Sequence, residues 1–309
     1  MADSEIALPQ KTREQQWVVW DSTRLNDFKF RPDDIMICTW SKSGTTWMQQ
    51  IVAQLVLNGD PEAYGQALSP WPEFRLLPKE QWFAIAEAQT HRRFIKSHSP
   101  LHAIPFRADV KYIYVGRDVR DVIWSMYHHQ SSFTPQAYQA FNTVPGRVGP
   151  PLEPPNCDVR AYYHSFLEKN ATPGMMTDTE FWANVQEFWN IRHLPNVLLV
   201  HYADLKANFK GEVARIAKFL GIEVSAELWP KIIEHCGMEH MRKLGRNVES
   251  VSMLFDGGID TFIHKGTNGR WKDVLSPEEI ALADTVAAKN LTPDCARWLK
   301  TGQLPRGEK

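Results

Sequence analysis

An apolar run that leads through a small polar loop into a helical pattern constrains the fold most. Asp33–Trp40 (DDIMICTW) predicts a buried strand. Ser41–Thr46 forms the loop, and Trp47–Asn58 (WMQQIVAQLVLN) has helical spacing and ends at an Asn-Gly pair. A strand, a glycine-containing loop and a helix in this order aim backbone N–H groups and the positive end of the helix at an anion.

Further apolar runs and helical patterns follow this unit along the chain. The expected strands are Arg93–Ser97, Lys111–Gly116 and Asn196–Tyr202, and the expected helices are about Val119–Gln130 and Phe209–Leu220. Apolar strands that alternate with amphipathic helices indicate a parallel sheet covered on both faces. The sequence therefore predicts an α/β fold: a central parallel β-sheet flanked by helices, with ligands at the carboxyl ends of the strands.

The composition is that of an ordinary globular protein. Of the 309 residues, 43% are hydrophobic and 23% are charged, which is enough apolar material for a core. We expect residues 1–309 to form a single domain. Lys and Arg total 35 against 36 Asp and Glu, and this balance argues against a nucleic-acid-binding protein.

The N-terminus and the cysteines indicate the compartment. The N-terminal segment MADSEIALPQKTREQQ is polar and lacks the layout of a signal peptide, and no run approaches the roughly 18 apolar residues of a membrane span. Cys38, Cys157, Cys236 and Cys295 form no CxxC pair, so neither a disulfide framework nor a zinc site is indicated. We expect a cytoplasmic protein with no transmembrane segment.

One segment departs from the strand and helix pattern. Ser131–Asp158 contains six prolines and two glycines, and it is too long for a simple connection in a compact domain. Long loops of this kind are commonly either lids over a site or surface insertions without a role. Both interpretations stay open from the sequence.

The loop after the first strand has the groups that a phosphate requires. Gly44 permits close approach of the backbone, Thr45 and Thr46 offer hydroxyls, and Lys42 offers a positive charge. It is not a Walker A loop, because Lys42 precedes Gly44 instead of following it. The alternative is an ordinary capped turn between a strand and a helix.

Two later segments carry basic residues with hydroxyls or glycines. Arg117 follows a predicted strand, where its fork can hold a phosphate, and Ser125 lies eight residues further on. Ile263–Trp271 (IHKGTNGRW) combines two glycines with basic side chains. Taken alone, Arg117 could pair with a neighbouring aspartate, and the second segment could be a solvated basic turn.

Together and in this order, the segments resemble the cytosolic-type sulfotransferase family, in a bacterial-like form. That family transfers the sulfuryl group of 3′-phosphoadenosine 5′-phosphosulfate (PAPS) to a hydroxyl or amine. Ser41–Trp47 is similar to its 5′-phosphosulfate loop P-K-S-G-T-T-W, Val115–Tyr127 to its 3′-phosphate segment R-(x)7-S, and His264–Trp271 to its loop R-K-G-x-x-G-x-W. The resemblance spans residues 33–277 and implies a P-loop-NTPase-like sulfotransferase fold.

The resemblance also implies roles for single residues. Lys96-Ser-His98 is similar to the family's K-T-H, so His98 is expected to be the general base that takes the acceptor proton. Lys42 and Lys96 are expected to stabilise the sulfuryl and leaving-group oxygens, so no metal is expected. The residues expected to bind PAPS are Lys42, Ser43, Gly44, Thr45, Thr46, Trp47, Arg117, Ser125, Tyr202, Met238, His264, Lys265 and Gly266.

Several positions depart from the family pattern. His264 stands where arginine is usual, so we expect 3′-phosphate binding to be weaker or pH-dependent. Met238 replaces a phenylalanine that stacks on adenine, Arg270 a common aspartate, and Ser41 a proline. Lys272–Pro277 does not reproduce the K-x-x-x-T-V dimer motif of vertebrate members, and the oligomeric state stays open.

Two functions stay open beside an active PAPS-dependent sulfotransferase. One is a small-molecule kinase, although its G-x-x-x-x-G-K-T loop is absent. The other is a degenerate member that binds PAPS, or the product adenosine 3′,5′-bisphosphate (PAP), without catalysis. The segments expected to shape the acceptor pocket are Trp17–Phe30, Trp71–Gln89 and Ser131–Asp158, whose Trp, Phe and Pro residues favour a small apolar or aromatic acceptor.

Overall fold

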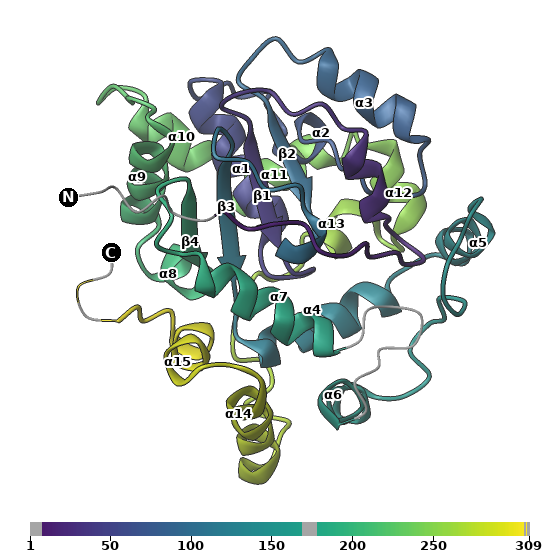
Figure 1. The fold of residues 1–309 in the computed structure, drawn as a ribbon. Coiled ribbons are helices and arrows are strands. Elements are labelled where there is room, and N and C mark those ends of the chain that lie inside the picture. Colours follow the sequence, from purple (N-terminus) through teal and green to yellow (C-terminus); the bar gives the residue numbers. More distant parts are fainter. Residues whose placement is uncertain (1–7, 169–177, 306, 308–309) are drawn as a thin grey trace.

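The computed structural model describes residues 8–168, 178–305 and 307. Four parallel strands in the order β2-β1-β3-β4 form a sheet at its centre (Figure 1). They are β1 (Ile35–Thr39), β2 (Phe94–Ser97), β3 (Lys111–Gly116) and β4 (Val197–His201). Each lies within a strand predicted from the sequence. The register aligns Cys38 of β1 with Ser97 of β2 and Tyr114 of β3, so the carboxyl ends of these strands meet at one edge.

Both faces of the sheet are buried, because alternate strand residues point to opposite sides. Ile35 and Ile37 belong to one apolar core, and Met36 and Cys38 to the other. The first core is completed by α1 (Thr45–Val56), α9 (Phe209–Leu220) and α10 (Trp229–His235). The second is completed by α4 (Val119–Ser131), α6 (Val159–Glu168), α7 (Asp178–Asn190), α14 (Pro277–Asn290) and α15 (Pro293–Thr301).

Shorter elements surround this three-layer arrangement, and the sequence did not predict them. They are η1 (Ser22–Asn26), α2 (Gly65–Leu68), α3 (Lys79–Glu87), η2 (Leu101–Ala103), α5 (Pro135–Thr143), α8 (Tyr202–Ala207), α11 (Met238–Gly245), α12 (Glu249–Leu254) and α13 (Gly258–Phe262). All of these have fewer than ten residues, which is too short for a clear helical period.

The proline-rich segment is not a continuous loop, and this corrects the expectation from the sequence. Pro135 opens α5, and the Thr134 hydroxyl caps the helix by accepting from the Ala137 N–H. A capping threonine followed by proline is a helix start, which the number of prolines in the segment obscured. An antiparallel bridge from Phe133 to Phe255 holds α5 beside the end of α12, and residues 144–158 contain no helix or strand.

Candidate active site

The carboxyl ends of all four strands open into one cavity of about 880 Å³. The loop after β1 contributes Lys42, β2 leads to His98, β3 to Arg117 and β4 to Tyr202. The sheet order changes direction at β1, because β2 lies on one side of it and β3 on the other. Such a switch point is where open α/β sheets bind ligands. Of the residues expected to bind PAPS, all except Ser43 line this cavity.

The loop between β1 and α1 has an unusual backbone. Gly44 has φ +118° and caps α1, and a Cβ added there would lie 2.7 Å from Cδ2 of Tyr202. Lys42 has φ +69°, which is uncommon for a residue with a side chain. Ser43 is buried and its N–H donates to the Trp40 carbonyl at 3.2 Å, so it belongs to the turn itself. The turn places the Lys42 side chain in the cavity.

Replacing Gly44 with alanine is expected to lower PAP affinity by at least about tenfold, through backbone strain and displacement of Tyr202. Gly221 is a matched control, since it also has a positive φ (+67°) but no atom within 4 Å of an added Cβ. Gly221→Ala is expected to lower thermal stability and leave PAP affinity unchanged. Calorimetric titration of both variants checks this. Unchanged PAP affinity in Gly44→Ala would contradict the close approach inferred for this loop.

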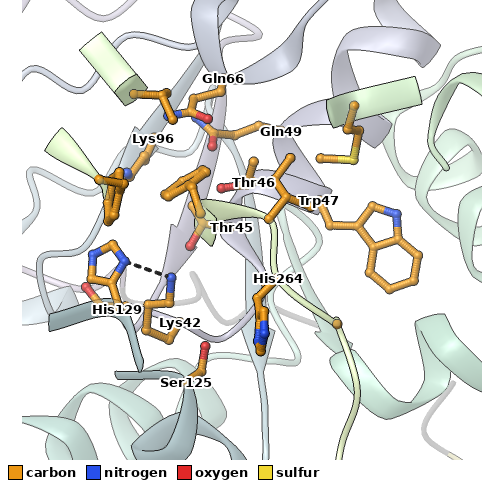
Figure 2. A pocket seen from close by; sticks show the side chains of 18 of the residues that line it. Lys42, Thr45, Thr46, Trp47, Gln49, Gln66, Lys96, Ser125, His129 and His264 are labelled. Atoms are coloured by element: carbon orange, nitrogen blue, oxygen red, sulfur yellow. Dashed lines mark hydrogen bonds between the residues drawn. The ribbon is translucent and has the colours of Figure 1, made fainter. Parts of the chain in front are cut away.

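Lys42 meets a histidine that the sequence analysis did not identify. Figure 2 shows the ammonium pointing toward His129, with Nζ 3.1 Å from Nδ1. Burial, then the charges of Arg117, Lys96 and Arg270, lower the pKa of Lys42 to about 7. Burial and Lys42 hold the pKa of His129 well below its usual range, so the neutral ring accepts this hydrogen bond. His129 follows Ser125 by four residues on α4. Residues with this spacing lie on the same face of a helix, so the spacing could have predicted that His129 also faces the cavity.

His98 is held in one orientation at the end of β2. Its Nδ1 lies 2.8 Å from the Thr39 carbonyl, an acceptor, so Nδ1 carries the proton and Nε2 the lone pair. Nε2 makes no hydrogen bond to any residue that the structure describes. Burial and the charge of Lys96 hold the pKa of His98 well below its usual range. The ring is therefore neutral at pH 7 and can accept a proton at Nε2.

Lys96 lies on β2 with a buried carboxyl close by. Its Nζ lies 3.9 Å above the Trp71 ring, and burial lowers its pKa to about 8. Glu73 accepts hydrogen bonds from the hydroxyls of Ser97 (2.7 Å) and Ser99, and burial raises its pKa to about 7. A negative Glu73 favours the charged form of Lys96. No sequence motif marks Glu73, so its place beside Lys96 was not predicted.

Flat side chains gather on the other side of the phosphate loop. Trp47 stacks on Phe209 with ring centroids 5.1 Å apart, and the Tyr202 ring meets its edge at 5.6 Å. The Tyr202 hydroxyl donates to the Gly266 carbonyl at 3.2 Å. A Cβ at Gly266 would lie 2.7 Å from Sδ of Met238, so this glycine permits the close contact. The cluster is a platform on which a nucleobase could stack. Phe209 was predicted as the start of a helix but not as part of this site.

Arg117 joins the phosphate loop to the glycine-containing basic loop. Its guanidinium lies 4.3 Å above the Tyr202 ring and donates to the Lys42 carbonyl at 3.0 Å and to Asn268 Oδ1 at 2.9 Å. His264 stacks on His128 with centroids 4.1 Å apart, and burial lowers its pKa to about 4. The ring is therefore neutral near pH 7 in the free protein and supplies no charge to a phosphate, so weaker 3′-phosphate binding at position 264 stays a prediction.

The rest of the cavity is largely apolar. Each of the three segments expected to shape an acceptor pocket contributes to the lining. They supply Val19 and Trp20, then Trp71, Phe74, Leu76, Leu77 and Trp82, then Ser132, Phe133 and Phe141. Further side chains of this wall come from α12 and its flanks and were not predicted; they are Val248, Ser250, Val251, Met253, Leu254 and Phe255. Aromatic and aliphatic side chains beside a few polar groups favour an acceptor with a large apolar body.

The described residues contain no group of three or more His, Cys, Asp or Glu side chains placed to hold a metal ion. In the same residues, no helix has both the length and the apolar character needed to cross a bilayer.

Comparison with known proteins agrees with this fold. A model of the sulfotransferase domain matches residues 32–293, so the chain belongs to the sulfotransferase family. Among its relatives, it is 30% identical over 309 residues to a glycolipid sulfotransferase of Mycobacterium tuberculosis, with 92% of each chain covered. It is 29% identical to sulfotransferase 1A1 of Rattus norvegicus, with 88% of each covered.

Solved structures show the same fold. Retinol dehydratase in complex with androsterone and PAP superposes with a TM-score of 0.69 at 24% identity, covering 89% of this chain and 87% of that one. Mouse sulfotransferase SULT7A1 complexed with PAP gives 0.67 at 21% identity, covering 90% and 91%. The family and the α/β fold predicted from the sequence are confirmed. Membership supports the expected enzyme class, a PAPS-dependent sulfotransferase.

Proposed function

We propose that this protein transfers the sulfuryl group of PAPS to a hydroxyl, or an amine, of an apolar acceptor, with His98 as the general base. The observation that carries the proposal is an excess of positive charge in the cavity. Lys42, Lys96 and Arg117 all line it, and none forms an ion pair within 4 Å with any carboxylate that the structure describes. Buried cations without an anionic partner are costly, and an anionic ligand would supply the missing negative charge.

Different residues of the cavity would contact the 5′-phosphosulfate, the adenine and the 3′-phosphate of PAPS. Lys42 and the hydroxyls of Thr45 and Thr46 would hold the 5′-phosphosulfate at the start of α1, where the helix favours negative charge. The platform of Trp47 and its neighbours would hold the adenine. Arg117 would contact the 3′-phosphate, together with Ser125 and Lys265.

The chemistry requires a base and a stabilised leaving group. Nε2 of His98 would accept the acceptor proton as the hydroxyl attacks sulfur, while Nδ1 stays bonded to Thr39. Lys42 and Lys96 would stabilise the charge that develops on the sulfuryl oxygens and on the oxygen of the departing phosphate. Sulfated acceptor and PAP are the products, and the acceptor proton remains on His98 until it passes to solvent.

The acceptor would bind against the aromatic wall. We propose that α5 and the residues before it form part of this wall rather than an independent insertion, because Phe133 and Phe141 face the cavity. The Ser132 carbonyl accepts from the Asp256 N–H at 2.8 Å, which ties the segment to the residues that follow α12. The large apolar lining fits a phenol, a sterol-like alcohol or a lipid-like acceptor.

Incubation with PAPS and a panel of acceptors tests the proposal. We expect mass spectrometry to detect sulfated products from apolar alcohols or phenols together with PAP, and none from highly charged sugars. PAP binding without sulfation of any acceptor in a broad panel would favour a degenerate binding protein. Transfer from ATP instead of PAPS would support the kinase alternative.

The affinity for PAP is expected to depend on pH through Lys42. Burial and neighbouring cations lower the pKa of the free lysine to about 7, and a bound phosphate favours the ammonium form. Above pH 7, binding therefore takes up a proton, and affinity falls about tenfold per pH unit between pH 7.5 and 9. Calorimetry in buffers of different ionisation enthalpy measures this uptake. Lys42→Arg, which stays charged, is expected to flatten the profile, and a flat wild-type profile would contradict the lowered pKa.

A further inference from the structure

The arginine of the basic loop, Arg270, faces the same cavity as Arg117. Arg270 is half-buried, and its Nη1 lies 3.3 Å from Nδ1 of His264. Because His264 is neutral near pH 7, Nδ1 can accept this hydrogen bond from the guanidinium. The ring of His264 is itself held by stacking on His128. His264 thus orients a cation instead of supplying one.

Arg270 has the charge and the free donors to bind an anion. A guanidinium has five N–H donors, and the hydrogen bond to His264 uses one of them. Arg270 forms no ion pair within 4 Å among the residues that the structure describes. Its charge lowers the pKa of Lys42, and the charge of Arg117 lowers its own, so the three cations act on one another. Asp121 is the nearby acid, and it is engaged by the Gly269 N–H at 2.7 Å.

We propose that Arg270 binds the 3′-phosphate of PAPS and that His264 positions it, so that this pair determines the preference for a nucleotide with a second phosphate. The inference rests on the proposed function, since it assigns a residue to the donor of that reaction. It also gives Arg270 a role at a position where the family commonly has an aspartate. The cation missing at position 264 is supplied from position 270 of the same loop.

The test compares PAP with adenosine 5′-monophosphate (AMP), which lacks the 3′-phosphate. Calorimetric titration is expected to show that Arg270→Ala lowers PAP affinity by about 10- to 100-fold and leaves AMP affinity unchanged. Lys272→Ala removes the same charge from an exposed position directly after the loop, and it is the matched control expected to change neither affinity. Loss of AMP binding in Arg270→Ala would indicate that this variant is misfolded. In that case the same titrations are made with Arg270→Gln.

The outcomes separate this inference from the function on which it rests. If wild-type protein does not prefer PAP over AMP, the proposed donor is wrong. If it does, and Arg270→Ala or Arg270→Gln keeps the full preference, the assignment of Arg270 is overturned.

The positioning role of His264 has its own measurement. His264→Ala is expected to lower PAP affinity in wild-type protein and to have no further effect in the Arg270→Ala background, because it acts through Arg270. Additive losses would show that His264 binds the phosphate by itself and would contradict the positioning role. His264→Arg introduced into Arg270→Ala is expected to recover most of the PAP preference, since the charge returns to the same loop.

Discussion

Replacing His98 with alanine is expected to lower kcat by about 10²- to 10⁴-fold and to leave PAP affinity within about twofold of wild type. The structure gives the reason. His98 places an unprotonated Nε2 in the cavity, whereas the 5′-phosphate is expected at Lys42 and Thr45. Loss of the His98 ring thus removes the proton acceptor and retains the residues that are expected to bind PAPS. Single-turnover assays with PAPS, together with calorimetry for PAP, measure the two effects separately.

His193→Ala is a suitable control for this variant, because His193 is an exposed histidine outside the cavity. It is expected to keep wild-type kcat and PAP affinity. Wild-type turnover in His98→Ala would contradict the role of His98 as the general base, even if PAP binding were normal. Equal loss of PAP binding and turnover would instead show that His98 supports the shape of the cavity.

Lys42→Ala is expected to lower both PAP affinity and kcat. Removing a charge-assisted contact to phosphate costs about 1.5–3 kcal/mol in binding, and loss of a preorganised cation at the reacting group costs about 10²- to 10³-fold in kcat. The variant keeps a side chain at φ +69°, so it does not relieve the backbone strain of the loop. The expected effects therefore come from the lost ammonium group. Steady-state kinetics and PAP titration at pH 7 measure them.

Lys265→Ala is a useful comparison, because Lys265 also lines the cavity but is exposed. Exposed ion pairs contribute about 0–1 kcal/mol, so its loss is expected to weaken PAP binding only slightly and to leave kcat unchanged. If Lys42→Ala affected PAP affinity as little as Lys265→Ala and kcat not at all, the assignment of Lys42 to the phosphosulfate would fail.

The fold could be predicted from the sequence because its core elements carry strong local signals. The run around Ile35 is apolar throughout, and residues 209–220 form a helix with both boundaries as expected, ending at Gly221 with φ +67°. The short helices α10–α13 carry weaker signals, because few turns fit between their ends. The start of α5 at Pro135 was hidden by the prolines around it.

The phosphate loop could be predicted for a similar reason, since its groups lie close together in the sequence. The remaining side chains reach the cavity from distant segments. Phe209 stacks on Trp47 from 162 positions away, and Glu73 meets Ser97 across a chain crossover. His129 was within reach of prediction through its helical spacing from Ser125. The contact between His264 and Arg270 depends on how the loop folds back, which the sequence pattern does not encode.

The proposed function requires that the cavity binds a nucleotide with both a 5′- and a 3′-phosphate and that this binding needs no metal. Both requirements are measured by calorimetric titration of wild-type protein with PAP and with ADP, each with and without Mg²⁺. We predict tight binding of PAP that is unchanged by Mg²⁺, and much weaker binding of ADP. Preference for ADP in the presence of Mg²⁺ would contradict the account and would favour a kinase.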